Sequence, residues 1–319
     1  MITFAETNKK IAIIGECMAE VSQLSLQPGE ASSDAKLSFG GDTLNCAIYM
    51  AREGVSPAFI TSIGDDFVSD WMLSCWQEEA VDCQYVSQEP GSAPGLYAIR
   101  TDSDGERSFT YWRSGSPASR MFDSETKINR VFTALEQFDL VFLSGISLAI
   151  ISDQDKEQII ERLGHYRKAG GLVVFDGNYR QQLWDSLAST RLWYDRLYKE
   201  VDIALATLDD EQKIYPGSTQ EDVAERLLAS GVSEVVLKLG EKGCSIYDPS
   251  TQKGIAVSTT PVKPVDTTSA GDSFNGAYLA QRIQGENPLE AAKHANQVAA
   301  HVVMHKGAIV PKSIYGVEK

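Results

Sequence analysis

Short apolar runs that end in glycine or aspartate alternate with longer amphipathic segments along most of this chain. Such runs are typical of parallel strands buried on both faces, and they span residues 10–16, 58–63, 140–143, 172–175, 203–206 and 235–239. The amphipathic segments at 42–53, 67–80, 153–169 and 219–229 have the length and pattern of helices. Strands that alternate with helices predict an α/β fold with a doubly wound, mostly parallel sheet flanked by helices.

The predicted strands run into polar or glycine-bearing loops, for example Gly64-Asp65 and Asp176-Gly177-Asn178. Ligands of doubly wound sheets bind at the carboxyl ends of the strands, so we expect the functional site at these loops. The C-terminal third adds a hairpin at 244–247 and 255–258 and two helices at 271–283 and 288–304.

Two segments interrupt the alternation. Residues 18–39 are β-like without a helix, and residues 95–113 have the pattern of a hairpin around the polar turn Asp102-Ser103-Asp104-Gly105. We expect segments of about 17–39 and 94–114 to pair as a small sheet that covers the carboxyl edge as a lid, which would exclude water from a site at this edge. Surface decoration is the alternative. With no repeats or low-complexity linkers, the chain is expected to form one domain over residues 1–319.

The 319-residue chain carries a formal net charge of −15. Such a chain repels nucleic acid and anionic membranes, so we expect neither as a partner. No stretch approaches 18 uninterrupted apolar residues, and residues 1–10 lack a secretory signal pattern, which predicts a cytoplasmic protein. Its 5 scattered cysteines form no Cys-x-x-Cys pair, so free thiols are expected.

The segment 266–276 gives the clearest indication of a chemical function; its sequence is Asp-Thr-Thr-Ser-Ala-Gly-Asp-Ser-Phe-Asn-Gly. Ser269, Ala270 and Gly271 permit a tight bend before a helix, whose first amides lack intrahelical partners and favour an anion. Asp272 would repel that anion, which makes sense if its carboxylate faces a hydroxyl that attacks a bound phosphate. The alternative is an ordinary helix start in which Asp272 serves the helix dipole.

A second segment, Gly40-Gly41-Asp42-Thr43-Leu44-Asn45, also precedes a predicted helix. The glycines permit close backbone approach to a ligand, and Asn45 can hydrogen-bond hydroxyls; a capped strand-to-helix turn is the alternative. The chain contains neither the Gly-x-x-x-x-Gly-Lys-Ser/Thr loop nor the Gly-x-Gly-x-x-Gly fingerprint. Any nucleotide must therefore be held in another way.

Together, these two segments resemble the two signatures of the ribokinase-type (pfkB) sugar kinases, and the likeness runs from Ile11 to Pro311. This resemblance implies a ribokinase-like fold. A narrower resemblance, to family members that phosphorylate the sugar acid 2-keto-3-deoxygluconate, rests on residues 15–18, 41–45, 111–113, 175–180, 183–184 and 208–211.

The resemblance implies phosphorylation of a sugar hydroxyl with ATP and Mg²⁺, and it allows for a monovalent cation. Asp272 is implied as the catalytic base, with the amides of Ala270, Gly271 and Asp272 as an anion hole. The implied nucleotide site consists of Lys238, Gly240, Gly243, Ala270 and Gly271, with Asn275 and Asn296 near the adenosine. The implied substrate residues are Gly41, Asn45, Tyr97, Tyr111, Arg113, Arg180 and Asp272.

The chain departs from the family pattern at two places. Many relatives carry Asn-x-x-Glu after the sixth strand, where this chain has Thr207 and Asp210. Asp210 is therefore implied to reach the metal only through water. Glu16 stands at the end of the first strand, where many relatives have aspartate.

The expected base of the site is an ordinary carboxylate. A helix N-terminus favours the anion of Asp272, so this carboxylate is expected to be ionised at neutral pH. It is a weak base for an alcohol, but phosphoryl transfer depends more on positioning and charge stabilisation than on early proton removal.

Two arginines carry the substrate prediction. Arg113 ends the predicted lid hairpin and Arg180 follows a strand end. If both face one pocket, they can grip a carboxylate, with the Tyr97 and Tyr111 hydroxyls alongside. A neutral sugar does not need two guanidinium groups. The alternative is that either arginine pairs with a local acid or contacts an ATP phosphate.

These arguments predict a cytoplasmic kinase that transfers phosphate from ATP to the terminal hydroxyl of 2-keto-3-deoxygluconate, giving 2-keto-3-deoxy-6-phosphogluconate. A kinase of another sugar, such as fructose or a nucleoside, stays open, as does a non-catalytic protein that senses sugar or nucleotide on the same scaffold. Because the exposed face of a β lid often pairs with another lid, a homodimer through the lid is a further prediction.

Overall fold

A nine-stranded sheet with the order β13-β12-β11-β10-β9-β8-β1-β4-β5 forms the centre of the computed structural model, which describes residues 2, 9–24, 29, 31–101, 107–250 and 253–316. Its strands are β1 (Ile11–Ile14), β4 (Ala58–Gly64), β5 (Val86–Glu89), β8 (Leu140–Ser144), β9 (Leu172–Asp176), β10 (Ile203–Thr207), β11 (Glu234–Lys238), β12 (Cys244–Tyr247) and β13 (Ile255–Val257). All neighbours are parallel except β11–β12 and β12–β13. The parallel strands therefore end together at one carboxyl edge.

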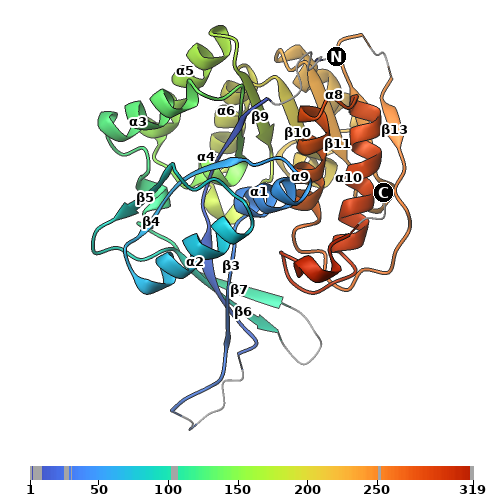
Figure 1. Ribbon diagram of the computed structural model, residues 1–319. Coiled ribbons are helices and arrows are strands. Elements are labelled where there is room, and N and C mark those ends of the chain that lie inside the picture. Colours follow the sequence, from blue (N-terminus) through green and yellow to red (C-terminus); the bar gives the residue numbers. More distant parts are fainter. Residues whose placement is uncertain are drawn as a thin grey trace.

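Helices cover both faces of this sheet (Figure 1). The first face packs against α1 (Asp42–Arg52), α2 (Phe67–Glu78), α9 (Ala270–Ile283) and α10 (Pro288–Val302). The second face packs against α3 (Glu125–Leu135), α4 (Gly145–Ala149), α5 (Asp153–Lys168), α6 (Leu187–Tyr198), α7 (Leu208–Ile214) and α8 (Gln220–Ala229). Neighbouring residues of β1 alternate between the two apolar cores, as expected of a strand buried on both sides.

This architecture confirms the predicted doubly wound fold, including the C-terminal hairpin and the two last helices. The structure adds elements that the sequence pattern did not reveal: α3, α6, α7 and the edge strand β5. The sequence of β5, Val-Ser-Gln-Glu, has too few apolar residues for a strand signal, because only one neighbour pairs with it. The cysteines are free, as predicted, and Cys17, Cys46 and Cys244 are buried.

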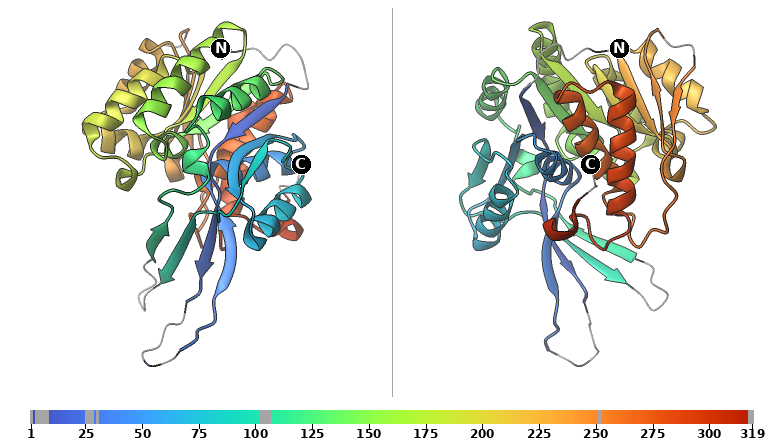
Figure 2. Two further views of the ribbon diagram at one scale, coloured as in Figure 1. Left: turned by 90° about the vertical axis from the view of Figure 1, so that its left-hand side faces the viewer. Right: turned by 45° about the vertical axis from the view of Figure 1, so that its right-hand side comes forward.

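A separate four-stranded sheet of order β3-β2-β6-β7 projects from the body (Figure 2). It comprises β2 (Met18–Ser22), β3 (Lys36–Gly40), β6 (Leu96–Thr101) and β7 (Arg107–Trp112). The two interrupting segments thus pair as predicted, with β2 and β6 running parallel at their junction. The polar turn predicted at Asp102–Gly105 lies outside the described residues. We refer to these four strands as the lid sheet.

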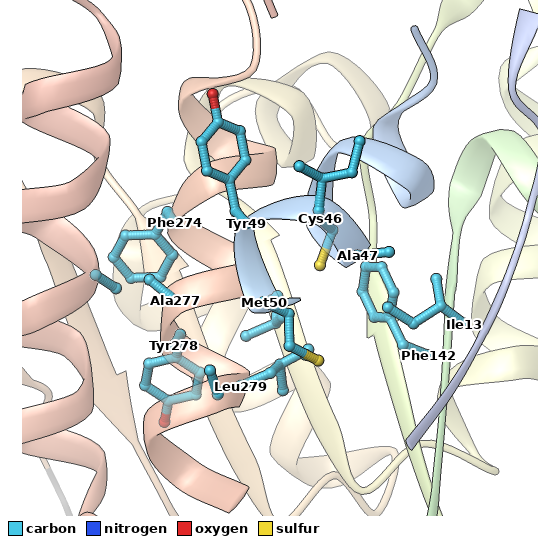
Figure 3. Packing of buried hydrophobic residues seen from close by; sticks show 14 of the residues in the cluster. Ile13, Cys46, Ala47, Tyr49, Met50, Phe142, Phe274, Ala277, Tyr278 and Leu279 are labelled. Atoms are coloured by element: carbon cyan, nitrogen blue, oxygen red, sulfur yellow. The ribbon is translucent and has the colours of Figure 1, made fainter. Parts of the chain in front are cut away.

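The close packing of α1 against α9 positions the two signature segments (Figure 3). Gly276 makes this approach possible, since a Cβ atom there would lie 2.6 Å from the Cys46 carbonyl oxygen and 2.9 Å from the Tyr49 Cβ. Tyr49 and Met50 of α1 and Phe274 and Tyr278 of α9 belong to the same core. The starts of the two helices are therefore held side by side at the carboxyl edge.

Candidate active site

Three helices begin at the carboxyl edge without a side-chain cap. The N-cap residues of α1, α7 and α9 are Gly41, Thr207 and Ser269, and none of their side chains accepts a hydrogen bond from the first turn. By contrast, the N-cap side chains of α2, α3, α4, α5, α6, α8 and α10 all do so. Uncapped first-turn amides are available donors for an anion.

The start of α9 is open to solvent. Ser269 takes a left-handed conformation (φ 64°), which bends the chain into the helix. Thr267 and Thr268 are exposed, and Ser269 to Asp272 are half-buried. The Ala270 amide donates a long hydrogen bond of 3.3 Å to the Thr267 carbonyl. Of the three predicted anion-hole amides, those of Gly271 and Asp272 are therefore the better placed to receive a ligand.

Asp272 lies within a group of acidic side chains. Asn45 Nδ2 donates to Asp272 Oδ2 over 2.8 Å, so the two signature segments meet at this carboxylate. Burial and the nearby Asp42 and Asp176 carboxylates raise the pKa of Asp272 from 3.8 to about 7, against the effect of the Asn45 hydrogen bond. The ionisation of Asp272 predicted at neutral pH is therefore only partial, because burial and two like charges outweigh the helix dipole.

Asn45 has a second feature that suits an alcohol. Its side-chain oxygen is buried and has no hydrogen-bond partner among the described residues. A buried acceptor without a donor is costly unless a ligand completes it. A hydroxyl that approaches Asp272 could donate to this oxygen.

Lys238 and Asn275, both predicted near the nucleotide, join Asp176 in a closed set of hydrogen bonds. Lys238 Nζ lies 3.2 Å from Asp176 Oδ1 and 3.0 Å from Asn275 Oδ1, and Asn275 Nδ2 donates to Asp176 Oδ2 over 2.8 Å. Asn275 is only 1% exposed, and both its polar atoms are engaged. Its side chain therefore faces the protein interior, and a contact with adenosine stays a prediction.

The start of α1 is tied to two strand ends. Asn178 Nδ2 donates to Asp42 Oδ2 over 2.6 Å. Gly41 is extended (φ −178°), and a Cβ atom there would collide with the Glu16 carbonyl oxygen. The structure thus explains Gly41 by the contact with the end of β1, and a substrate contact at Gly41 stays a prediction.

Arg113 forms a buried ion pair with Glu16, which also accepts a 2.6 Å hydrogen bond from Ser116 Oγ. The pair uses Arg113 Nη2, while Arg113 Nε is buried without a hydrogen-bond partner in the described part of the chain. The alternative that Arg113 pairs with a local acid is therefore realised, although one buried N–H group is left over.

Arg180 is more exposed, at 50% of its side chain. Its Nη1 donates to the Tyr179 carbonyl over 3.2 Å and lies 4.0 Å from Asp210 Oδ2. Because this ion pair is long and solvated, it restrains the guanidinium group only weakly.

The two predicted tyrosines lie on neighbouring lid strands. Tyr97 and Tyr111 are paired residues of β6 and β7, with ring centroids 5.9 Å apart. The Tyr97 hydroxyl donates to Glu20 Oε2 over 2.5 Å, so it is already engaged, whereas Tyr111 is exposed.

The remaining predicted nucleotide residues lie beside β11 and β12. Gly240 and Gly243 bound the short turn between these strands, with φ values of 61° and 88°. Asn296 of α10 donates to the Val257 carbonyl over 3.1 Å and is mostly buried. Asn296 thus ties α10 to β13, and a contact with adenosine stays a prediction.

Asp210, the predicted metal-linked residue, is flanked by cations. Lys213 Nζ lies 2.9 Å from its Oδ1, in addition to the Arg180 contact. No group of three or more His, Cys, Asp or Glu residues that could hold a metal occurs within the described ranges. A direct metal site at Asp210 is thus not preformed.

Sequence reasoning assigned no role to Asp42, Asp176 or Asn178, which the structure brings into the site. Their signal was available, since all three lie in loops or strand ends at the carboxyl edge. A cavity of about 180 Å³ that includes Tyr85 and Arg130 in its lining lies elsewhere, near β5 and α3.

Comparison with known proteins decides the family. The model of the pfkB family of carbohydrate kinases matches residues 8–314. The chain belongs to the pfkB family of carbohydrate kinases. Enzymes of this family transfer a phosphoryl group to an alcohol, which agrees with a carboxylate that lies in the first turn of an uncapped helix.

This pfkB-family kinase is similar to named relatives over nearly its full length. It is 42% identical over 312 residues to 2-dehydro-3-deoxygluconokinase from Escherichia coli K12, covering 96% of this chain and 98% of the relative. It is 39% identical over 309 residues to the enzyme of the same name from Haemophilus influenzae, covering 95% and 96%.

Solved structures share the fold of this pfkB-family kinase. A double-mutant fructokinase from Vibrio cholerae, bound to fructose, ADP and potassium ion, has a TM-score of 0.77 at 23% identity, with 95% of each chain covered. Ribokinase from Thermotoga maritima has a TM-score of 0.74 at 24% identity, with 94% of each chain covered. In the described part of the kinase, no helix is long and apolar enough to span a bilayer.

Proposed function

We propose that this pfkB-family kinase phosphorylates the terminal hydroxyl of 2-keto-3-deoxygluconate, also called 2-dehydro-3-deoxygluconate, at the expense of ATP. The observation that carries the substrate choice is Arg113, a buried guanidinium group whose Nε has no partner among the described residues. A substrate carboxylate would complete it, and charge-assisted bonds of this kind are strong. The named relatives at 39–42% identity support the same substrate.

In the proposed reaction, the terminal hydroxyl oxygen of the sugar acid attacks the γ-phosphorus of ATP. The bond between this phosphorus and the β–γ bridging oxygen breaks, ADP leaves, and the hydroxyl proton passes to Asp272. With a pKa of about 7, Asp272 is better matched to this proton than an ordinary aspartate would be. Asn45 orients the carboxylate through its 2.8 Å hydrogen bond.

The residues present suit the triphosphate of ATP. The uncapped start of α9 offers amide donors, and the Lys238 ammonium lies beside it, 3.6 Å from where a Cβ on Gly271 would be. We place the phosphates here and the base near Gly240 and Gly243. Mg²⁺ neutralises phosphate charge when bound and keeps mostly water and phosphate ligands, so Asp210 would act only through water. A monovalent cation is a further proposal, since the Vibrio cholerae fructokinase structure contains potassium.

The proposed substrate pocket lies between the body and the lid sheet. Arg113 from the end of β7, Tyr111, Tyr97 and Arg180 would surround the sugar acid, with Gly41 and Asn45 beneath it. The exposed lid residues Leu37, Phe109 and Trp112 make a lid-to-lid homodimer part of the proposal. We place the enzyme in the cytoplasm, with no nucleic acid or membrane partner.

The decisive experiment measures ADP release with Mg²⁺ against a panel of sugars and sugar acids. We expect kcat/KM for 2-keto-3-deoxygluconate to exceed that for fructose or a nucleoside by at least about a hundredfold, because buried polar groups left unpaired discriminate strongly. Equal activity on fructose and on the keto acid would contradict the proposal, and ATP binding without any ADP release would favour a sensor.

Variants at the two arginines test the carboxylate contact. Arg113→Met and Arg180→Met should each raise KM for the keto acid by about tenfold or more, because each removes a charged hydrogen-bond donor. Arg196→Met serves as the control, since Arg196 pairs with Glu157 on the second face of the sheet. Unchanged KM in both site variants would remove the acid sugar from the proposal.

A further inference from the structure

Besides the proposed substrate residues, the site contains a buried, hydrogen-bonded set of Asp176, Lys238 and Asn275. We propose that Asp176 and Asn275 are positioning residues, which hold the Lys238 ammonium beside the opening of α9 so that it faces the phosphate being transferred. The inference rests on phosphoryl transfer at this site and is independent of which alcohol is the acceptor.

The three side chains come from three different elements. Asp176 ends β9, Lys238 ends β11, and Asn275 lies in the second turn of α9. Asp176 and Lys238 are 3% and 8% exposed. The Lys238 ammonium group thus joins the carboxyl edge of the sheet to the start of α9.

Asn275 locks the arrangement. Its side-chain oxygen accepts from Lys238 and its Nδ2 donates to Asp176, so its amide orientation is defined by both partners. Two of the three N–H donors of the Lys238 ammonium are thereby used. The third donor is left on a group that lies next to Gly271 at the start of α9.

The position of the ammonium distinguishes this set from a purely structural ion pair. A Cβ on Gly271 would lie in contact with Lys238 Nζ, at 3.6 Å, so the ammonium lies close beside the opening turn of α9. A phosphate that accepts hydrogen bonds from the Gly271 and Asp272 amides would come within reach of the Lys238 ammonium. A fixed positive charge here answers the charge on the transferred group without reorganisation during the reaction.

Asp176 also contributes to the field at Asp272. The ionisable groups around Asp272 are Asp42, Cys46 and Tyr49 of α1, Asp176 of β9 and Lys238 of β11. On α10, Lys293 pairs with Glu290, His294 with Glu53, and His301 with the Ile314 carbonyl. Removing the charge of Asp176 should therefore make Asp272 easier to ionise.

The test compares Asp176→Asn, Lys238→Met and the double variant, using ATP and whichever alcohol the wild-type enzyme phosphorylates best. We expect Asp176→Asn to lower kcat by about 10- to 100-fold, with KM for the alcohol changed less than about threefold. The acid limb of kcat/KM should move to lower pH by about one unit, a shift that a loss of folded protein does not produce.

The double variant decides whether Asp176 acts through Lys238. If it does, adding Asp176→Asn to Lys238→Met costs little more than Lys238→Met alone. A further full 10- to 100-fold loss, or a loss that added Mg²⁺ restores, would overturn the inference, because Asp176 would then act independently of the ammonium.

Asp202→Asn is the matched control. Asp202 is also a buried carboxylate paired with a cation, Arg167 at 2.8 Å, but it lies at the opposite end of β9, where it accepts from the Val173 amide. We expect it to change the melting temperature without moving the acid limb; an equal shift in this control would overturn the inference. If Asp176→Asn does not fold, Asn275→Ala takes its place, with an expected fall in kcat of about tenfold and an unchanged kcat overturning the inference.

Discussion

Two buried polar clusters touch α9, one at each end, and they differ in charge balance. At the C-terminal end, Glu234 accepts from Arg282 (2.7 Å to Oε2) and from the Tyr278 hydroxyl (2.7 Å), so this carboxylate is directly paired with a guanidinium group. At the N-terminal end, the carboxylates of Asp42 and Asp176 lie near that of Asp272, and the Lys238 ammonium contacts only the Asp176 carboxylate among these three.

This difference indicates that the cluster at the C-terminal end of α9 serves stability and the cluster at its N-terminal end serves chemistry. A buried ion pair with all its hydrogen bonds made is compatible with a stable fold. An excess of buried negative charge is costly, and such perturbed groups cluster at functional sites. We infer that the balanced cluster holds α9 in place, and we assign the proposed reaction to the unbalanced cluster.

The largest effect should come from the unbalanced cluster. Asp272→Asn should lower kcat by about a thousandfold or more, because an amide cannot accept the hydroxyl proton. ATP binding, measured by calorimetry, should remain within about threefold of the wild type. A variant that retained more than a tenth of wild-type kcat would remove Asp272 from its role as base.

The balanced cluster should behave in the opposite way. Glu234→Gln removes the carboxylate that accepts from the buried Arg282 guanidinium and should lower the free energy of unfolding by about 3 kcal/mol. Because Glu234 lies at the far end of α9, kcat per folded molecule should be unchanged. Denaturant unfolding together with active-site-normalised rates would check both parts, and a loss of kcat with unchanged stability would break the comparison.

Asp272 should also oppose folding at high pH. Its pKa is raised in the folded protein from 3.8 to about 7, so folding loses stability as the pH rises through this range, and the full loss is present above pH 7. Asp272→Asn should therefore be more stable than the wild type at pH 8, by about 1–3 kcal/mol, and similar to it near pH 4. Thermal unfolding at the two pH values measures this difference; a less stable variant at pH 8 would contradict it.

The smallest predicted effect is on the wild-type pH profile. Because Asp272 must be ionised to accept a proton, kcat/KM should fall on the acid side with an apparent pKa of about 7, and should be about five- to tenfold lower at pH 6 than at pH 8. Initial rates at constant free Mg²⁺ would test this, and Asp176→Asn would separate Asp272 from the nucleotide, because only titration of Asp272 should move in that variant. A flat profile down to pH 5 would mean that the acidic neighbours do not affect Asp272.

Much of the fold followed from local patterns. The buried strands and amphipathic helices could be located because each pattern is contained within its own segment, as at β1 and α5. The edge strand β5 could not, because it is short, polar and paired on one side only.

The site was predictable in its parts but not in its electrostatics. The 266–276 segment pointed to Asp272 because the helix start and the acid are adjacent in sequence. Its raised pKa depends on burial and on Asp42 and Asp176, and the pairing of Arg113 depends on Glu16. These partners are distant along the chain, so only the folded arrangement reveals them.

The uncapped starts of α1, α7 and α9 have a consequence for the whole enzyme. Most α-helices of this protein are capped by its own side chains, whereas the first-turn amides of these three are left for a bound ligand. A ligand bound at these amides would stabilise the folded state, so the resistance of this enzyme to heat and proteolysis should increase with the concentration of its ligands.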